Sequence, residues 1–465
     1  MRFRGGRRQK NQLELAFVPI GGGEASAVGK GGTETPRAAQ VCQGPAMATE
    51  FLMEEVCDPG NLKRALQRVC QNQGDPGMDG MTVQQLPAYL GDHWSEVRSQ
   101  LLGGGYKPRA VKRIEISKPE GGSRKLGIPT VLDRLVQQAI LQVLQKRWDP
   151  TFSEHSYGFR PHRDAHQAVA RAQEIVAQGY GWVVDIDLEQ FFDRVNHDRL
   201  MARVAERVAD KRLLKLIRAF LNAGILEDGL VRPTEEGTPQ GSPLSPLLSN
   251  LVLDELDREL EKRGLPFVRY ADDCNIYVRS ERAGQRVMKS ISDFLTRKLR
   301  LKVNATKSAV AKPSERKFLG FSFWLNPAPR RIIAPQALAR FRRRVVELTG
   351  RNRGIGLERM IGELNQYLRG WIQYFGFCER RTELKDLDGW IRRRLRSAAW
   401  KQWKTGRQRY RVLLRLGVTA ERAKAVAGSS RGPWPMSRNK VIHQALSNRY
   451  LRNLGLLSLE TWPSA

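Results

Sequence analysis

The feature of this chain that most limits its fold is a change of hydrophobic periodicity near Pro329. Between residues 47 and 326, stretches with apolar residues at helical spacing, such as 132–144, alternate with short strand-like runs, such as 113–117 and 181–188. Beyond Pro329 only the helical spacing remains. The pattern predicts an α+β region followed by an all-helical region, with helices expected over residues 337–348, 357–375 and 391–403.

The second constraint is charge. The chain has 79 Lys and Arg against 48 Asp and Glu, a formal net charge of +31. Nucleic acid or an anionic membrane surface would neutralise such an excess. No run approaches the roughly 20 apolar residues of a membrane span. Residues 330–416 alone hold 23 basic and 7 acidic residues, so we expect a helical region that binds nucleic acid.

Cysteine and histidine give little sign of a metal site. The five cysteines are scattered and contain no C-x-x-C pair, which argues against zinc and against a secreted disulfide framework and favours the cytoplasm. His162 and His166 are four residues apart and would meet on one face of a helix. A solvated or phosphate-facing helix start is the simpler interpretation of the two histidines.

Two segments carry closely spaced acids. Asp272 and Asp273 are at the centre of residues 267–278, which read as two strands meeting at a tight turn. Asp185 and Asp187 alternate with apolar residues, so both are expected on one face of a strand. Taken alone, the first pair also fits a solvated turn and the second a solvated sheet edge.

Taken together, the two acidic segments favour a paired-strand metal site. Joining a nucleotide to a 3′-hydroxyl places negative charge on the attacking and leaving oxygens, which two divalent ions can stabilise. Magnesium takes its other ligands from water and substrate phosphates, so two or three carboxylates suffice.

Five segments of the chain resemble those of group II intron reverse transcriptase/maturases. They follow the family's order, and the resemblance extends from about residue 47 to the C-terminus. The segments are 157–161 (Tyr-Gly-Phe-Arg-Pro), 187–193 (Asp-Leu-Glu-Gln-Phe-Phe-Asp), 237–246 (Gly-Thr-Pro-Gln-Gly-Ser-Pro-Leu-Ser-Pro), 270–273 (Tyr-Ala-Asp-Asp) and 318–321 (Phe-Leu-Gly-Phe).

The resemblance implies a right-hand polymerase, an α+β fold with fingers and an antiparallel palm sheet over residues 47–326. A helical thumb, or maturase (X) domain, is expected over 327–416 and a DNA-binding segment over 417–465, with a turn at 432–435 and a helix over 440–451. Residues 1–46 are expected to be a disordered Gly-rich basic arm or an upstream extension, with Met47 as an alternative start. A His/Cys-rich endonuclease domain, frequent in the family, is not expected.

The resemblance also assigns catalytic roles. The family's first catalytic acid precedes by five residues an aromatic ring that abuts the nucleotide sugar. Asp187 and Phe192 have this spacing, whereas Asp185 would place Gln190 there. The implied ligands of two Mg²⁺ ions are Asp187, Asp272 and Asp273, with Asp273 the most peripheral and Asp185 a supporting acid. Phe192 would exclude a ribonucleotide's 2′-hydroxyl.

Other residues are expected to contact the incoming dNTP. Lys118 and Arg124 resemble the finger cations that bind its triphosphate, although an ordinary charged hairpin would look the same. Gln240 and Gly241 resemble the loop beneath the nucleotide and template base. Lys307 resembles a lysine near the leaving pyrophosphate.

The implied function is an RNA-directed DNA polymerase that copies intron RNA into DNA and assists splicing. Expected partners are group II intron RNA, a DNA target and a primer–template duplex. The aromatic residues of the helical region are expected mostly in its core. Expected nucleic-acid contacts are Arg342, Arg343, Arg344, Arg392, Arg393 and Arg394. Two alternatives are an RNA-binding splicing factor with an inactive site and a domesticated relative serving phage defence or repair.

Overall fold

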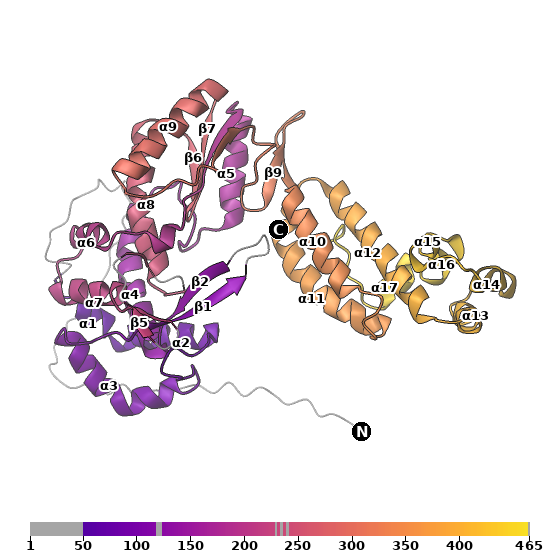
Figure 1. The fold of residues 1–465 in the computed structure, drawn as a ribbon, viewed down its shortest axis with the longest axis horizontal. Helices are drawn as coiled ribbons and strands as arrows, with labels where there is room; N and C mark the ends of the chain where they lie inside the picture. The colour runs from indigo at the N-terminus through magenta and orange to yellow at the C-terminus, as the bar shows by residue number, and fades with distance from the viewer. Residues whose placement is uncertain (1–49, 118–122, 228–229, 233–235, 239–240, 464–465) are drawn as a thin grey trace, which may run out of the picture.

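The computed structural model describes residues 50–463, except 118–122, 228–229, 233–235 and 239–240. The predictions for residues 1–46, Lys118 and Gln240 therefore lie outside the described residues. The described chain has the predicted α+β class, and its helical C-terminal part extends as an arm to one side of the α/β part (Figure 1).

The first part of the chain combines helices with a small mixed sheet. Its helices are α1 (Leu52–Val56), α2 (Pro59–Asn72), α3 (Leu86–Leu102) and α4 (Val131–Trp148). Its strands are β1 (Val111–Ser117), β2 (Ser123–Ile128), β4 (Ile225–Glu227) and β5 (Leu230–Arg232), in the order β2-β1-β4-β5. β1 and β4 are parallel, so this sheet is not purely antiparallel. The β1–β2 hairpin extends toward the arm (Figure 1).

The second sheet carries the predicted acids. Its order is β6-β7-β3-β8, all antiparallel, with β3 (Trp182–Ile186), β6 (Phe267–Tyr270), β7 (Asp273–Val278) and β8 (Ala309–Ala311). Val184 and Ile276 belong to the core formed with α8 (Ser245–Lys262) and α9 (Glu281–Arg297). Val183 and Tyr277, on the other face, belong to the core formed with α5 (Ala165–Ala177). We call this four-stranded sheet the acidic sheet.

Short elements connect β3 to α8. A 3-10 turn at Phe191–Asp193 is followed by α6 (His197–Ala205) and α7 (Lys211–Leu221). His197 is buried, and its Nε2 lies 2.6 Å from the Gly237 carbonyl oxygen. This contact joins the start of α6 to the loop that precedes α8.

A hairpin of β9 (Phe321–Trp324) and β10 (Arg330–Ile333) leads into the arm. β10 falls where only helices were expected. The arm then begins with α10 (Pro335–Leu348), α11 (Leu357–Phe375) and α12 (Arg381–Gln402), close to the predicted helices. Val183 of the acidic sheet and Phe341 of α10 belong to one continuous hydrophobic core, which fixes the arm against the sheet.

His166 lies on α5 and helps join it to the arm, whereas His162 precedes α5, so the two do not share the face of one helix. The Nε2 of His166 lies 2.7 Å from the Tyr374 carbonyl oxygen, and its ring stacks on Phe377. Trp371, Trp400 and Trp403 are buried, which confirms the prediction that the arm's aromatic residues are mostly core.

The arm ends in short helices: α13 (Gly406–Arg415), α14 (Ala420–Ala427), α15 (Pro433–Met436), α16 (Lys440–Ala445) and α17 (Asn448–Asn453). The expected turn at 432–435 is thus mostly the short helix α15. The expected helix over 440–451 is two helices, because Ser447 caps a new one by accepting the Tyr450 N–H. Asp388 of α12 accepts the Leu459 N–H, so the chain's last described segment folds back onto the arm.

In the described part of the chain, none of the helices combines the length and the apolar character that crossing a bilayer requires.

Candidate active site

The register of the acidic sheet brings the two acidic segments together. Ile186 of β3 is paired with Cys274 of β7 in an antiparallel ladder. The next position along each strand is therefore Asp187 opposite Asp273. Residues opposite each other in such a ladder have Cβ atoms about 5 Å apart. Pairing of β3 with β7 thus brings together the two acidic segments, which their separation in sequence did not determine.

A cavity of about 550 Å³ lies at this end of the sheet. Asp187, Asp272 and Asp273 all line it. The other lining residues are Ser123, Lys125, Leu188, Glu189, Gln190, Phe191, Phe192, Asp193, Asn304 and Lys307. The β1–β2 hairpin, the loop after β3 and the segment before β8 therefore share one site with the acids.

Asp273 has several acidic neighbours. Its side chain is exposed to the cavity, yet its pKa is raised to about 7, in the first place by loss of hydration among the surrounding protein atoms and then by the negative charges of Asp272, Asp185 and Asp187. Lys317 opposes this rise. Such a cluster is unfavourable by itself and favours binding of cations.

Asp187 is held by the segment before β8. Its N–H donates to Ser308 Oγ at 3.0 Å, and its carbonyl oxygen accepts the Asn304 N–H at 2.8 Å. Lys307 Nζ lies 3.9 Å from Asp187 Oδ2. The predicted lysine therefore lies beside a predicted metal ligand in the same cavity.

Asp185 has a different environment. Arg316 donates to its Oδ2 from Nε at 2.8 Å and from Nη2 at 2.6 Å. The same Nη2 donates to the Lys307 carbonyl oxygen at 2.6 Å. Burial raises the pKa of Asp185, and the Arg316 guanidinium opposes this rise. Asp185 therefore has a protein cation as partner, as befits the supporting role predicted for it.

The loop that carries Phe192 is fixed by a contact with the segment at 237–241. Phe192 packs edge-to-face on buried Phe191, with ring centroids 5.3 Å apart. The Phe192 carbonyl oxygen accepts the Thr238 N–H at 2.6 Å. At Gly237, which has φ of +94°, an added Cβ would lie 3.0 Å from the Asp193 backbone. The two predicted segments thus form one packed unit.

Gly241 allows the same segment to approach the β1–β2 hairpin. Its φ is +113°, and an added Cβ would lie 2.8 Å from the Gly127 carbonyl oxygen. Glycine is needed here for both its conformation and its size. The close approach is to the protein's own backbone, whereas the prediction placed it beneath a nucleotide.

The β1–β2 hairpin contributes a residue that sequence reasoning missed. Lys125 lines the cavity and lies 3.7 Å from Glu115 in an ion pair. Ser123, two residues earlier on the same strand face, lines the cavity too. Alternation along β2 was the signal that would have found Lys125. Arg124 lies on β2 paired with Ile116, but its side chain lies outside the described residues, like Lys118.

The two arginine triplets of the arm differ. Arg342, Arg343 and Arg344 are exposed on α10, and Arg344 forms an ion pair with Glu347 at 2.8 Å. By contrast, the triplet on α12 is half-buried and has partners within the chain. Arg392 lies 3.8 Å from Asp388, Arg393 lies over the Trp434 ring at 3.8 Å, and Arg394 donates to Thr349 Oγ1 at 2.6 Å.

Within the described ranges, no three His, Cys, Asp or Glu side chains form a ready-made metal site. The donor set nonetheless fits a hard divalent cation, because it consists of carboxylates and includes one whose pKa is raised by loss of hydration and by its acidic neighbours.

Two family models match the chain. Residues 116–323 match the reverse transcriptase (RNA-dependent DNA polymerase) family, and residues 338–417 match the group II intron maturase-specific domain. The first contains the acidic sheet, and the second contains α11 and α12.

Individual proteins are similar in sequence to part of the chain. Protein YkfC of Escherichia coli (strain K12) is 37% identical over 228 residues, covering 48% of this chain and 60% of that protein. The group II intron-encoded protein LtrA of Lactococcus lactis subsp. cremoris is 34% identical over 206 residues, covering 44% of this chain and 34% of that protein. The matches thus span less than two thirds of these relatives.

Among solved structures, a partial Cas6-RT-Cas1–Cas2 complex matches 56% of this chain and 45% of that chain, with 24% identity and a TM-score of 0.35. This likeness is too distant to bear on function. The two family models match in this order along the chain: it contains a reverse transcriptase domain followed by a group II intron maturase-specific domain, and it is homologous to the group II intron-encoded protein LtrA.

Proposed function

We propose that the chain is an RNA-directed DNA polymerase that copies group II intron RNA into DNA during mobility and binds the intron RNA to assist its splicing. One observation carries the proposal: acids from two distant segments line one cavity, together with the β1–β2 hairpin. The free cysteines at positions 57, 70, 274 and 378 support the expected cytoplasmic location.

In this proposal Asp187, Asp272 and Asp273 hold two Mg²⁺ ions. When bound, the ions supply electrostatic stabilisation of the charge that develops on the attacking and leaving oxygens. Asp185 does not compete for them, because Arg316 already neutralises it. Arg316 also holds the Lys307 segment in place, by donating to the Lys307 carbonyl oxygen.

The remaining residues orient the nucleotide. Lys125 and Lys307 enter the cavity from the hairpin and from the segment before β8, where they would meet the triphosphate. Lys118, Arg124 and Gln240 keep their predicted roles as nucleotide contacts. Gly241 itself approaches the Gly127 carbonyl oxygen of the hairpin closely.

Primer extension tests the proposal. The full chain is given a DNA primer on an RNA template, dNTPs and MgCl₂, and extension products are resolved by length. We expect template-directed extension that stops when EDTA removes the metal. A purified, folded chain that binds RNA but extends no primer would contradict the polymerase and favour an RNA-binding splicing factor.

Phe192→Ala is expected to increase use of ribonucleotides. Phe192 lines the cavity, its ring packs on the Phe191 ring, and its backbone carbonyl oxygen accepts the Thr238 N–H. Pockets that reject one extra group by shape discriminate by roughly 10- to 200-fold. The ratio of kcat/KM for a ribonucleotide to that for its dNTP should therefore rise at least about tenfold. An unchanged ratio would remove Phe192 from this role.

Arg342→Gln/Arg343→Gln is expected to weaken RNA binding. Both side chains are exposed on α10 in the basic arm. The logarithm of the association constant falls linearly with the logarithm of the salt concentration, and each lost phosphate contact makes this slope shallower by about 1. Loss of both arginines should therefore make the slope shallower by about 2. Titration of intron RNA at several salt concentrations measures the slope. Arg282→Gln/Arg286→Gln on α9 removes the same charge from another exposed surface and should leave the slope nearly unchanged.

A further inference from the structure

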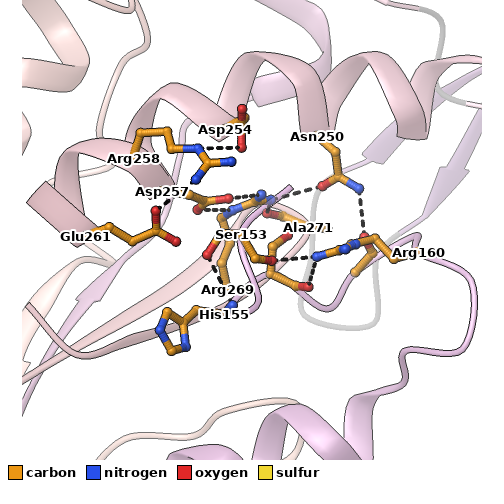
Figure 2. A network of polar contacts seen from close by, with 12 residues as sticks. Ser153, His155, Arg160, Asn250, Asp254, Asp257, Arg258, Glu261, Arg269 and Ala271 are labelled. Carbon is orange, nitrogen blue, oxygen red and sulfur yellow. Dashed lines mark hydrogen bonds and ion pairs between the residues drawn. The ribbon is translucent and has the colours of Figure 1, made fainter. Parts of the chain in front are cut away.

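A fully buried arginine lies just before the Asp272–Asp273 turn. Arg269 of β6 is 0% exposed, and its Nε and Nη2 donate to the Asp257 carboxylate of α8 at 2.7 and 2.5 Å. Its Nη1 donates to Asn250 Oδ1, also of α8, at 3.0 Å, and to the Ala271 carbonyl oxygen at 2.9 Å (Figure 2). One guanidinium thus connects the turn to two positions of a single helix.

The residue that receives this contact has an unfavourable conformation. Ala271 has φ of +58°, in the left-handed region that residues with a Cβ rarely adopt. It lies directly between Tyr270, the end of β6, and Asp272. Non-glycine residues remain in this region only where their surroundings hold them. The bond from Arg269 to the Ala271 carbonyl oxygen is one contact that holds Ala271 in this conformation.

A second segment packs closely against the same turn. Asn250 Nδ2 donates to the Gly158 carbonyl oxygen at 2.9 Å. The Gly158 backbone lies so close that an added Cβ would be 2.2 Å from the Ala271 nitrogen. Asn250 therefore connects Arg269 to the segment that packs on the turn peptide.

We propose that Arg269, Asn250 and Asp257, here called the hairpin clamp, hold Asp272 and Asp273 in the orientation that binds divalent ions and thereby set the ion affinity. This inference rests on the proposed polymerase function. The three are positioning residues, because they contact the turn and α8 rather than the substrate.

Stability alone does not explain the clamp. Replacing a buried ion pair by apolar residues of similar volume is often neutral or stabilising, whereas removing one partner is strongly destabilising. An apolar pair would thus serve the core equally well but would lose the bond to Ala271. Residues that orient metal ligands typically change metal affinity or activity by about 10- to 100-fold.

The test compares ion binding in folded variants. Arg269→Met/Asp257→Leu removes both charges, and Asn250→Ala removes the connection to Gly158 while it leaves the ion pair. Binding of Mn²⁺ to the full chain is measured by electron paramagnetic resonance of the free ion. The Mg²⁺ midpoint of primer extension and the Kd for primer–template are measured in parallel.

We expect the Mn²⁺ Kd and the Mg²⁺ midpoint of the double variant to rise about tenfold or more. The Kd for primer–template should stay within about twofold. Asn250→Ala should shift both ion measurements in the same direction. Asp210→Ala breaks the ion pair between the buried Asp210 and the half-buried Arg212, and should lower the Tm without changing the Mn²⁺ Kd.

The outcomes separate the two proposals. An unchanged Mn²⁺ Kd in the folded double variant overturns the clamp, and Asn250→Ala decides the question if the double variant does not fold. A wild-type chain that does not bind Mn²⁺ also overturns it. If the wild type binds Mn²⁺ and the variants weaken binding, but no primer is extended, the clamp stands and the polymerase function falls.

Discussion

Asp272→Asn is expected to lower the rate of DNA synthesis at least about a thousandfold, because a direct ion ligand contributes several kcal/mol to the transition state and about 1.4 kcal/mol corresponds to a factor of ten. The neutral amide removes one charge from the cluster around Asp273, so the fold should persist. Single-nucleotide incorporation under excess enzyme measures the chemical step.

Two controls accompany this variant. Asp293→Asn removes an exposed acid from α9 and should extend primers at the wild-type rate. RNA binding by Asp272→Asn should match the wild type, since the arm is untouched. A loss of less than about tenfold, with a normal circular dichroism spectrum, would exclude Asp272 as an ion ligand.

Gly158→Ala is expected to lower incorporation by about a hundredfold, since a misplacement of about 1 Å costs about that factor. The added methyl group would lie 2.2 Å from the Ala271 nitrogen and 2.9 Å from the Ala271 Cα. Both are backbone atoms, so the turn that carries Asp272 must move. The kcat should fall and the Mg²⁺ concentration that gives half-maximal primer extension should rise, whereas the Kd for primer–template should stay the same.

Gly181→Ala is the matched control for this change. Gly181 precedes β3 in the same sheet, and an added Cβ there meets nothing within 4 Å. Activity should therefore be nearly unchanged. Gly158→Ala with more than half of the wild-type kcat would mean that the turn tolerates displacement and would weaken the assignment of the acids.

Much of the site was predictable because it is local in sequence. Alternation marked β3, and adjacent acids between apolar runs marked the β6–β7 turn. The pairing of β3 with β7 joins residues far apart along the chain, which no local pattern determines. The assignment of Asp187 over Asp185 came from the resemblance, and the Arg316 ion pair now gives a physical reason for it.

Other features depended on tertiary contacts. Arg269 interrupts an apolar strand, which signals a buried charge in need of a partner, but that partner lies on α8 and is not marked in the sequence. The basic run 392–394 was predicted to contact nucleic acid, and nothing in the sequence indicated that on α12 it would also pack against Trp434 and Thr349. The strand β10 forms because β9 offers a pairing edge, which overrides the basic, helix-like composition around it.

Carboxylates from two distant segments are proposed to share one pair of divalent ions. Anomalous diffraction from crystals of the full chain with primer–template, a non-reactive dNTP analogue and Mn²⁺ tests this sharing directly. We predict two Mn²⁺ peaks about 3.5–4 Å apart, both in contact with carboxylate oxygens of Asp187 and Asp272. Peaks at other residues, or none in this cavity, would contradict the account.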